Sequence, residues 1–213
     1  GTHGDEGYVL PDDLHGIAQA LSIGIGHDAS FDLELAQRGI PVIQYDPDVN
    51  GPPQAHPYFS FNKLAWAPRD HHQGLSLDSM IERHGFAHHD SGLLKFDVEG
   101  AEWACLNAAS QSSLLPFRII VCELHGLDKI GQPNLIPKMD SILRKLTHNH
   151  TVVHLHGNNV EDFADIQGFL IPPTIEITLL RNDRSAFTPA PILTPGSFDH
   201  PNDPNRPDLT FCS

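Results

Sequence analysis

Short apolar runs alternate with amphipathic segments along most of the chain, and this alternation predicts strands separated by helices. Seven runs have strand length, and we expect strands at 21–25, 42–45, 59–67, 93–100, 118–126, 151–159 and 174–180. Helices are predicted at 31–36, 76–81, 101–109 and 135–146, with Ser76 and Asn134 as caps of the second and the fourth. Strands separated by helices form a parallel sheet covered on both faces, so the pattern predicts an α/β fold.

The chain turns from the first strand into the first helix through Gly24-x-Gly26-x-x-Ala29. Neither glycine carries a Cβ, so the backbone can turn tightly there and approach a ligand closely. The first amides of the helix then face the ligand, and Asp46 ends the next strand 20 residues after Gly26. This order predicts a nucleotide-type cofactor whose two ribose hydroxyls donate to Asp46. A tight turn that binds nothing is the simpler alternative.

Polar side chains recur where the predicted strands end, at Asp46, Asp97, Glu99, Glu123, His125 and His156. The carboxyl ends of parallel strands form one edge of a sheet, and ligands of such sheets bind at that edge. Residues two apart in a strand point to the same side, so Asp97 can converge with Glu99, and Glu123 with His125. We therefore expect the active site at this edge.

The composition narrows the class of protein. A chain of 213 residues with 39% hydrophobic and 19% charged residues fits one globular domain, expected at 1–187, followed by an extended Pro-, Asn- and Asp-rich tail at 188–213. The net charge of −14 argues against nucleic acid as a partner, because phosphate backbones are bound by clustered Lys and Arg. No apolar run reaches membrane-spanning length and no signal peptide is visible, so we expect a cytoplasmic protein without a membrane partner. Cys105 and Cys122 lie in apolar segments and are expected to be buried free thiols.

Several motifs together resemble one known family. They are SIGIG at 22–26 with SFD at 30–32, LKFDVEGAEW at 94–103, ELH at 123–125, HGNN at 156–159 and PNDPNRPD at 201–208. In these motifs the chain is similar to the FkbM-type S-adenosylmethionine-dependent methyltransferases. The resemblance implies a Rossmann-like class I methyltransferase fold, with a seven-stranded, mostly parallel sheet, helices on both faces and an antiparallel last strand. It also implies methyl transfer to an oxygen of a small-molecule or glycan acceptor.

The resemblance makes S-adenosylmethionine the expected cofactor. The expected cofactor-binding residues are Gly24, Ile25, Gly26, Ser30, Phe31, Asp46, Pro47, Asp97 and Val98. Many class I methyltransferases carry an acid just before the glycine turn, where this chain has Ser22 and Ile23. We expect Asp97, or the segment around Asp5, to contact the cofactor amino group instead.

Methyl transfer to a hydroxyl requires that the acceptor be aligned with the sulfonium and lose its proton. The expected catalytic residues are Asp97, Glu99, His125 and His156. A neutral histidine beside a carboxylate can take the proton, with His125 favoured and His156 as the other candidate. Alternatively, a divalent metal held by Asp97, Glu99, Glu123 and His125 could bind the hydroxyl and lower its pKa. Glu102 lies one turn into a predicted helix and is expected to be solvated.

Two other functions fit part of the pattern. The glycine turn and Asp46 suit an NAD(P)-dependent oxidoreductase equally well on local grounds. The chain nevertheless offers no separate substrate domain and no clear Tyr-x-x-x-Lys pair. A non-catalytic, Rossmann-like binding module is the third interpretation.

Overall fold

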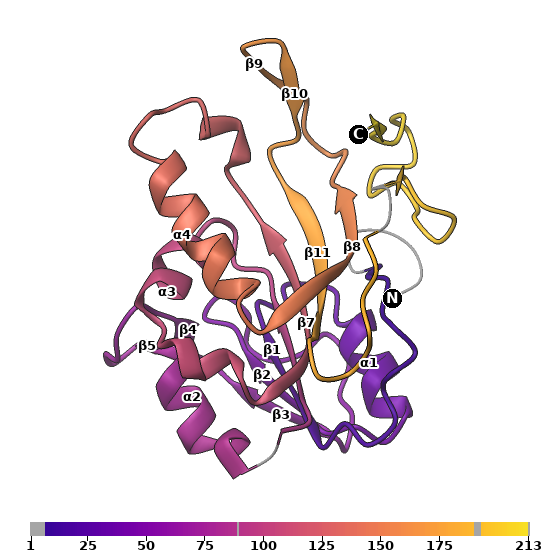
Figure 1. The fold of residues 1–213 in the computed structure, drawn as a ribbon. Coiled ribbons are helices and arrows are strands. Elements are labelled where there is room, and N and C mark those ends of the chain that lie inside the picture. Colours follow the sequence, from indigo (N-terminus) through magenta and orange to yellow (C-terminus); the bar gives the residue numbers. More distant parts are fainter. Residues whose placement is uncertain (1–6, 89, 190–192, 213) are drawn as a thin grey trace.

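A seven-stranded sheet runs through the centre of the computed structural model, which describes residues 7–88, 90–189 and 193–212 (Figure 1). Its strands are β1 (Gln19–Ile23), β2 (Val42–Tyr45), β3 (Phe59–Asn62), β6 (Gly92–Phe96), β7 (Phe117–Leu124), β8 (His150–Gly157) and β11 (Ile175–Arg181). Their order is β3-β2-β1-β6-β7-β11-β8. The first five strands in this order pair in parallel, whereas β11 is antiparallel to β7 and β8. The predicted class I methyltransferase fold is therefore confirmed.

Helices cover both faces of this sheet (Figure 1). They are α1 (Ser30–Gln37), α2 (Leu77–Arg83), α3 (Glu102–Ala108) and α4 (Ile136–Leu146), with short 3-10 turns η1 (Phe86–His88), η2 (Gln111–Leu114) and η3 (Leu127–Lys129). Successive residues of a strand point to opposite faces. Accordingly, Ala20 of β1 belongs to the core cluster of Phe31 in α1, and Leu21 belongs to the cluster of Met80 in α2 and Leu106 in α3.

The predicted third strand at 59–67 is two strands in the structure. The chain turns after β3, where the amide of Leu64 donates to the carbonyl of Asn62. It then forms β4 (Ala65–Trp66), which pairs with β5 (Gly74–Leu75) outside the main sheet. The buried Trp66 ring contacts Phe96 at the end of β6, with ring centroids 5.2 Å apart. Because of this packing, β3 ends at Asn62 and β4 lies beside the end of β6.

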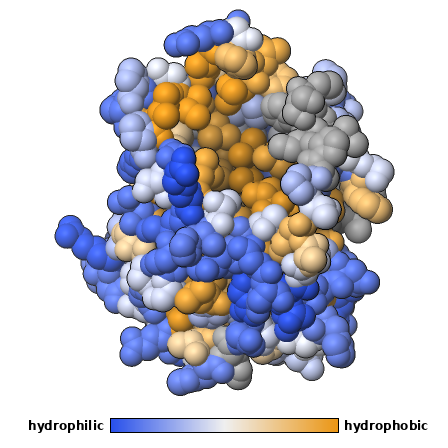
Figure 2. All heavy atoms as spheres, in the orientation of Figure 1, coloured by the Kyte–Doolittle hydropathy of each residue, from blue (hydrophilic) through white to orange (hydrophobic). Residues whose placement is uncertain are grey.

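A hairpin that the sequence analysis did not predict projects from the body between β8 and β11 (Figure 1). It consists of β9 (Ala164–Ile166) and β10 (Phe169–Ile171). Gln167 and Gly168 join them with φ of 56° and 87°, as a tight two-residue hairpin turn requires. Phe169 and Leu170 are 72% and 59% exposed, and Figure 2 shows hydrophobic atoms gathered toward this end of the molecule.

The C-terminal segment lies against β8 and β11, and its described part forms specific contacts. His154 pairs with Asp199, with 2.6 Å between Nε2 and Oδ1. Asn159 donates to the carbonyls of Asp203 and Arg206 at 3.0 and 3.2 Å. The segment also forms a short pair of strands, β12 (Leu193–Thr194) with β13 (Phe211–Cys212). The part of the tail after β12 is therefore fastened to the sheet, and the domain boundary at 187 stays a prediction.

The two predicted helix caps differ in outcome. The Ser76 hydroxyl accepts from the amide of Ser79, as the prediction for α2 requires. Asn134 does not cap α4, because the helix begins after Leu135 and has no side-chain cap. The prediction for Asn134 is therefore wrong.

Three other sequence expectations concern the thiols, the N-terminal segment and the membrane. Cys105 and Cys122 are free and buried, and burial, with the Glu102 charge, raises the pKa of Cys105 to about 12. Tyr8 stacks edge-on against Phe31, with ring centroids 5.3 Å apart, so this part of the N-terminal segment packs at α1. Residue 5 lies outside the described residues. None of the described helices is long and apolar enough to cross a membrane.

Candidate active site

The glycine turn lies where β1 and β6 end side by side. Gly24 has φ of 78°, and a Cβ built there would lie 1.7 Å from the carbonyl oxygen of Asp97. No side chain fits at this position, because the contact is with backbone of the neighbouring strand end. Gly26 has φ of 51°, and a Cβ there would meet nothing within 4 Å. The space beside Gly26 is therefore open to a ligand.

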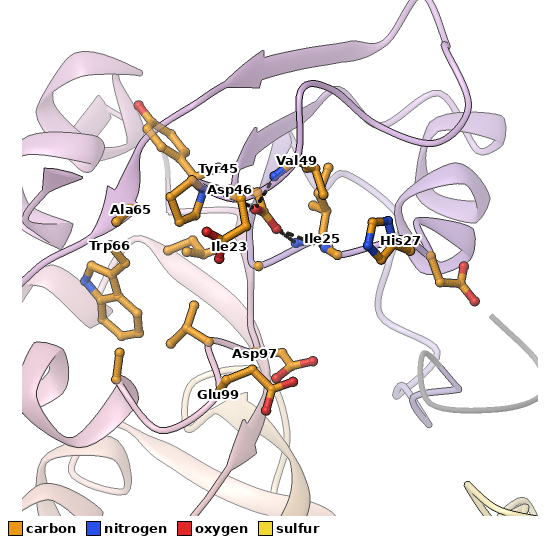
Figure 3. A pocket seen from close by; sticks show the side chains of 17 residues that line it. Ile23, Ile25, His27, Tyr45, Asp46, Val49, Ala65, Trp66, Asp97 and Glu99 are labelled. Carbon is orange, nitrogen blue, oxygen red and sulfur yellow. Dashed lines mark hydrogen bonds between the residues drawn. The ribbon is translucent and has the colours of Figure 1, made fainter. Parts of the chain in front are cut away.

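Asp46 ties the end of β2 to the glycine turn. Its Oδ2 accepts from the amides of Ile25 and Gly26, both at 3.0 Å (Figure 3). Its Oδ1 accepts from the amides of Asp48 and Val49 at 2.8 and 3.2 Å. Burial raises the pKa of Asp46, but these four amides outweigh burial and the net shift is downward. The carboxylate is therefore ionised at neutral pH and holds the shape of the turn.

A cavity of about 600 Å³ opens between the glycine turn and the ends of β2 and β6 (Figure 3). Of the predicted cofactor-binding residues, its wall includes Gly24, Ile25, Gly26, Asp46, Pro47, Asp97 and Val98. The wall also includes Glu99, which was predicted to be catalytic, and residues that were not predicted at all, namely Ile23, His27, Asp28, Tyr45, Asp48, Val49, Ala65, Trp66 and Ala101. Trp66 was the one with a usable signal, as the tryptophan of the run at 59–67.

Ser30 and Phe31 are not part of this wall. Phe31 is 3% exposed and packs in the core beneath α1. The amide of Ser30 donates to the Asp28 carboxylate at 2.7 Å, so a side chain of the loop occupies this helix-start amide. Neither residue lines the cavity, because the first turn of α1 faces the sheet, and their role in cofactor binding stays a prediction.

Beneath the turn, on the α1 side, three strands present a polar row. Gln44 of β2, Ser22 of β1 and Lys95 of β6 are in register. Gln44 donates to Asp32 of α1 at 2.7 Å, and Lys95 Nζ donates to the carbonyl of Gly24 at 2.5 Å. Burial raises the pKa of Asp32, and the Lys95 charge opposes that shift. The turn thus rests on a buried polar layer.

At the next strand ends, four carboxylates surround the imidazole of His125. Its Nδ1 lies 2.9 Å from Glu102 Oε1. Its Nε2 lies 3.7 Å from Asp97, 3.6 Å from Glu99 and 3.6 Å from Glu123. One ligand atom each from Asp97, Glu99 and His125 lies within 4.8 Å of the others. The predicted convergence of these strand-end residues is therefore present in the structure.

Glu102 is buried, so the expectation that it is solvated is wrong. Its side chain is 0% exposed and also accepts from the amides of Val98 and Gly100, each at 3.1 Å. The reason is that the first turn of α3 points inward, beneath the loop that joins β6 to α3 and carries Glu99. Burial raises the pKa of Glu102, but the bond and charge of His125 and the Gly100 amide lower it overall.

The electrostatics of the cluster favour a cation. Burial lowers the pKa of His125, but its hydrogen bond to Glu102 and the charges of Glu102, Asp97 and Glu99 raise it overall.

Glu99 has φ of 53°, in the left-handed region that non-glycine residues adopt at a cost. Figure 3 shows the carboxylates of Asp97 and Glu99 beside each other at one side of the cavity. The backbone of Glu99 is thus held in an unfavourable conformation at this site.

His156 lies two strands away and is not part of this cluster. Glu123, Glu176 and His156 are cross-strand neighbours on β7, β11 and β8. His156 Nδ1 lies 3.2 Å from Glu176, and its Nε2 lies 2.9 Å from Asp208 of the C-terminal segment. Burial lowers the pKa of His156, but these two carboxylates raise it to about 9. Both ring nitrogens of His156 are therefore bonded, and the residue lines neither cavity.

A second cavity of about 480 Å³ lies beside the first, and Glu99 lines both. Its wall is formed by Glu99, Gly100, Trp103, Ala104, His125, Gly126, Asp128, Lys129, Leu135, Lys138, Met139, Glu161, Pro173 and Thr174. The indole Nε1 of Trp103 donates to the carbonyl of His125 at 2.7 Å, which fixes this side of the wall. The His125 cluster therefore lies at the junction of two cavities. No pattern in the sequence predicted the second cavity.

The fold is that of the class I methyltransferases, and the larger cavity lies beside its glycine turn. The model of the methyltransferase FkbM domain matches residues 20–150, more than half of the chain. The chain therefore belongs to the FkbM methyltransferase family. This membership favours methyl transfer over NAD(P)-dependent oxidoreduction.

Solved structures similar to the chain are distant. A protein described as a hemolysin from Streptococcus thermophilus is 13% identical, with a TM-score of 0.40, over 78% of this chain and 60% of that one. This chain thus spans less than two thirds of that protein. A SAM-dependent methyltransferase from Archaeoglobus fulgidus is 12% identical, with a TM-score of 0.39, over 79% of this chain and 88% of that one. Neither likeness bears on function. A search of curated proteins finds no match.

Proposed function

We propose that this methyltransferase transfers the methyl group of S-adenosylmethionine to a hydroxyl of a small molecule or glycan. The observation that carries the proposal is the meeting of the two cavities at Glu99, beside Asp97 and His125. A cavity of about 600 Å³ is large enough for the cofactor, and one of about 480 Å³ for an acceptor group. A methyl donor in one and a hydroxyl in the other would meet at the cluster.

The cofactor would lie along the glycine turn in the larger cavity. The open space beside Gly26 lets the cofactor approach the backbone of the turn. Asp46 would accept hydrogen bonds from the ribose hydroxyls as well as from the turn amides. Trp66 and Val98 offer apolar surface for the adenine ring. Asp97 lies beside Glu99 in the wall of the larger cavity and would hold the amino group of the cofactor.

The reaction follows from this placement. The acceptor oxygen attacks the methyl carbon in line with the sulfonium, the carbon–sulfur bond breaks, and its electron pair stays on sulfur in S-adenosylhomocysteine. The hydroxyl proton leaves at the same junction, where His125 and the surrounding carboxylates can accept it. Glu102 holds the other ring nitrogen, so the imidazole presents Nε2 to this junction.

The wall of the second cavity suits a polar acceptor with several hydroxyls. It combines Trp103, whose indole offers a flat apolar surface, with the charged side chains of Asp128, Lys129, Lys138 and Glu161. Aromatic faces pack against sugar rings, while charged groups bind hydroxyls. This combination supports a sugar or another polyol over a flat apolar acceptor.

Calorimetric titration tests the cofactor assignment. We expect S-adenosylmethionine and S-adenosylhomocysteine to bind with one site per chain, and NAD not to bind. Incubation with methyl-labelled cofactor and fractionated glycans or small metabolites should then label an acceptor with alkali-stable ether bonds. Failure of both S-adenosyl compounds to bind would contradict the proposal, and label on nitrogen would contradict its oxygen specificity.

Replacing Asp46 tests the cofactor pose. Asp46→Ala removes the acceptor of four backbone amides, so we expect the free energy of unfolding to fall by about 2 kcal/mol. Affinity for S-adenosylmethionine should fall at least about tenfold, since bonds to a charged group contribute about 1.5–3 kcal/mol each. Asp12→Ala, at an exposed position outside both cavities, is the matched control and should change neither strongly. Unchanged cofactor affinity in Asp46→Ala would mean that the carboxylate only shapes the turn.

A further inference from the structure

Four carboxylates are concentrated around one histidine at the strand ends. Asp97, Glu99, Glu102 and Glu123 each place an oxygen within 3.7 Å of the His125 ring. With all four carboxylates ionised, the group carries four negative charges, and a protonated imidazole neutralises only one of them. Like charges this close raise the free energy of the folded protein unless a cation lies among them.

The two ring nitrogens of His125 are in different situations. Nδ1 forms a hydrogen bond of 2.9 Å, whereas the three carboxylates nearest Nε2 lie at 3.6–3.7 Å, beyond ordinary hydrogen-bond distance. Carboxylates and an imidazole nitrogen that converge on a common point are arranged as ligands of a metal are. Asp97, Glu99 and His125 have ligand atoms within 4.8 Å of one another, which suits coordination to one ion.

Glu102 provides the support that metal-binding histidines require. Such histidines commonly direct the non-ligating nitrogen at a carboxylate or carbonyl, which fixes the ring and its tautomer. Glu102 does this here, and it is itself held by the amides of Val98 and Gly100. Its Oε2 is buried and accepts no hydrogen bond from the described residues, so the carboxylate has capacity for a further positive partner.

The site is also accessible to an ion and to a substrate. The side chains of Asp97 and His125 are 18% and 16% exposed, whereas that of Glu99 is 88% exposed and closes the cluster from the solvent side. Glu99 lines both cavities, and its left-handed backbone places the carboxylate next to that of Asp97. An ion here would touch the methyl-transfer junction.

We infer that Asp97, Glu99 and His125 bind one hard divalent cation of the Mg²⁺ or Mn²⁺ type, with Glu123 beside it. Carboxylate oxygens with a single imidazole are donors that Mn²⁺ accepts, and the absence of thiolate among the three does not favour a soft metal. Binding of the ion stands independently of the proposed methyl transfer. Its role in the reaction rests on that proposed function.

In that role the cation takes the acceptor hydroxyl as a further ligand and lowers its pKa. The oxygen–hydrogen bond breaks, and the proton goes to Glu123 or to water. The oxygen forms its bond to the methyl carbon while the sulfur leaves with the electron pair. His125 is then a ligand of the cation and not the base.

Titration of the purified full chain with MnCl₂, without S-adenosylmethionine, tests the site. Electron paramagnetic resonance of free Mn²⁺ should show one ion bound per chain, and MgCl₂ should compete for it. Asp97→Asn and His125→Gln should each weaken Mn²⁺ binding at least about tenfold, and Glu102→Gln about 10–100-fold. Asp128→Asn is the matched control, because Asp128 lines the same cavity outside the cluster, and it should bind Mn²⁺ as the wild type does.

Tryptophan fluorescence locates the ion. The chain has two tryptophans, and Trp103 is bonded to the His125 carbonyl. Mn²⁺ should quench the emission of wild type and of Trp66→Phe, and quench Trp103→Phe much less. Thermal melting of each variant without metal identifies any that fail to fold, and the remaining variant then decides.

No binding of Mn²⁺ or Mg²⁺ would overturn the site and leave His125 as the base. Binding that all three cluster variants retain would also overturn it, because the ion would then be elsewhere. The cofactor titration separates the two proposals. A protein that binds S-adenosylmethionine but not Mn²⁺ would refute only the cation site. A protein that binds Mn²⁺ but not S-adenosylmethionine would refute only the methyltransferase assignment.

Discussion

His125 and His156 lie at the same edge of the sheet, and their surroundings give them different capacities. His125 has one nitrogen fixed by Glu102, and its other nitrogen faces carboxylates beyond hydrogen-bond distance beside two cavities. His156 has both nitrogens bonded, to Glu176 of β11 and to Asp208 of the C-terminal segment. The first histidine can exchange a proton or a ligand without losing a structural bond, and the second cannot.

The difference arises from the partners on either side of the antiparallel strand β11. Glu123 and His156 both neighbour Glu176 in register, so the three groups form a row across the sheet. On the His156 side the C-terminal segment covers the row, with Asn202 also bonded to Glu176 at 2.5 Å. On the Glu123 side the row reaches the His125 cluster, with Glu123 3.6 Å from Nε2. Chemistry is therefore expected on one side of β11 and attachment of the tail on the other.

The largest expected effect comes from matched substitutions of the two histidines. His125→Gln should lower turnover about 10²–10⁴-fold, the usual range for a group that handles the transferred proton or its cation. Affinity for S-adenosylmethionine should change little, because His125 lines only the second cavity. His156→Gln should keep turnover within a few-fold. Single-turnover rates with labelled cofactor measure both, and equal losses in the two variants would abolish the distinction between the histidines.

Removal of Glu102 should be the next largest effect, seen in stability. Glu102→Ala leaves the amides of Val98 and Gly100 and the Nδ1 of His125 without their acceptor, so we expect a loss of about 3 kcal/mol of unfolding free energy. Glu102→Gln retains an oxygen acceptor and should lose less. Glu161→Ala, at an exposed position of the second cavity, should stay within about 0.5 kcal/mol in urea unfolding. A Glu102→Ala protein as stable as wild type would show that these bonds contribute nothing.

The raised pKa of His156 predicts a pH dependence of stability. Because its folded pKa is about 9 and its ordinary value is 6.5, the stabilisation is complete below about pH 6.5 and is lost as pH rises through about 9. A shift of this size corresponds to roughly 3 kcal/mol. Urea unfolding at pH 6 and at pH 10 should therefore show a fall in wild type that is much smaller in His156→Gln. Equal falls in the two proteins would assign the pH dependence to other groups.

The smallest expected effect isolates the tail. Asp208→Asn keeps the shape of the side chain but removes its charge from His156 Nε2, 2.9 Å away, at a partly exposed position. We expect a loss of about 1 kcal/mol and faster proteolytic cleavage within 196–209. Turnover should not change, because Asp208 lines neither cavity. A loss of turnover comparable with that of His125→Gln would place the tail in the active site.

The glycine turn and the strands around it could be predicted from the sequence, because they depend on local chemistry. The position of Gly24 requires a residue without a Cβ, and Asp46 follows at the spacing that one strand–helix–strand unit imposes. The strand-end residues Asp97, Glu99, Glu123 and His125 were predicted to meet, since parallel strands end at one edge. The break after β3 was not predicted, because Trp66 packs on Phe96 from a distant strand.

The sequence by itself thus determined the order of strands and helices, the turn at Gly24 and the edge at which polar groups gather. Only the tertiary structure decided which of these groups face each other. Glu102 reaches His125 across 23 residues of chain, and Asp208 reaches His156 across 52. The physical reason is that periodicity gives the direction of a side chain within its own element. Burial and hydrogen-bond partners are set by the elements that pack against it.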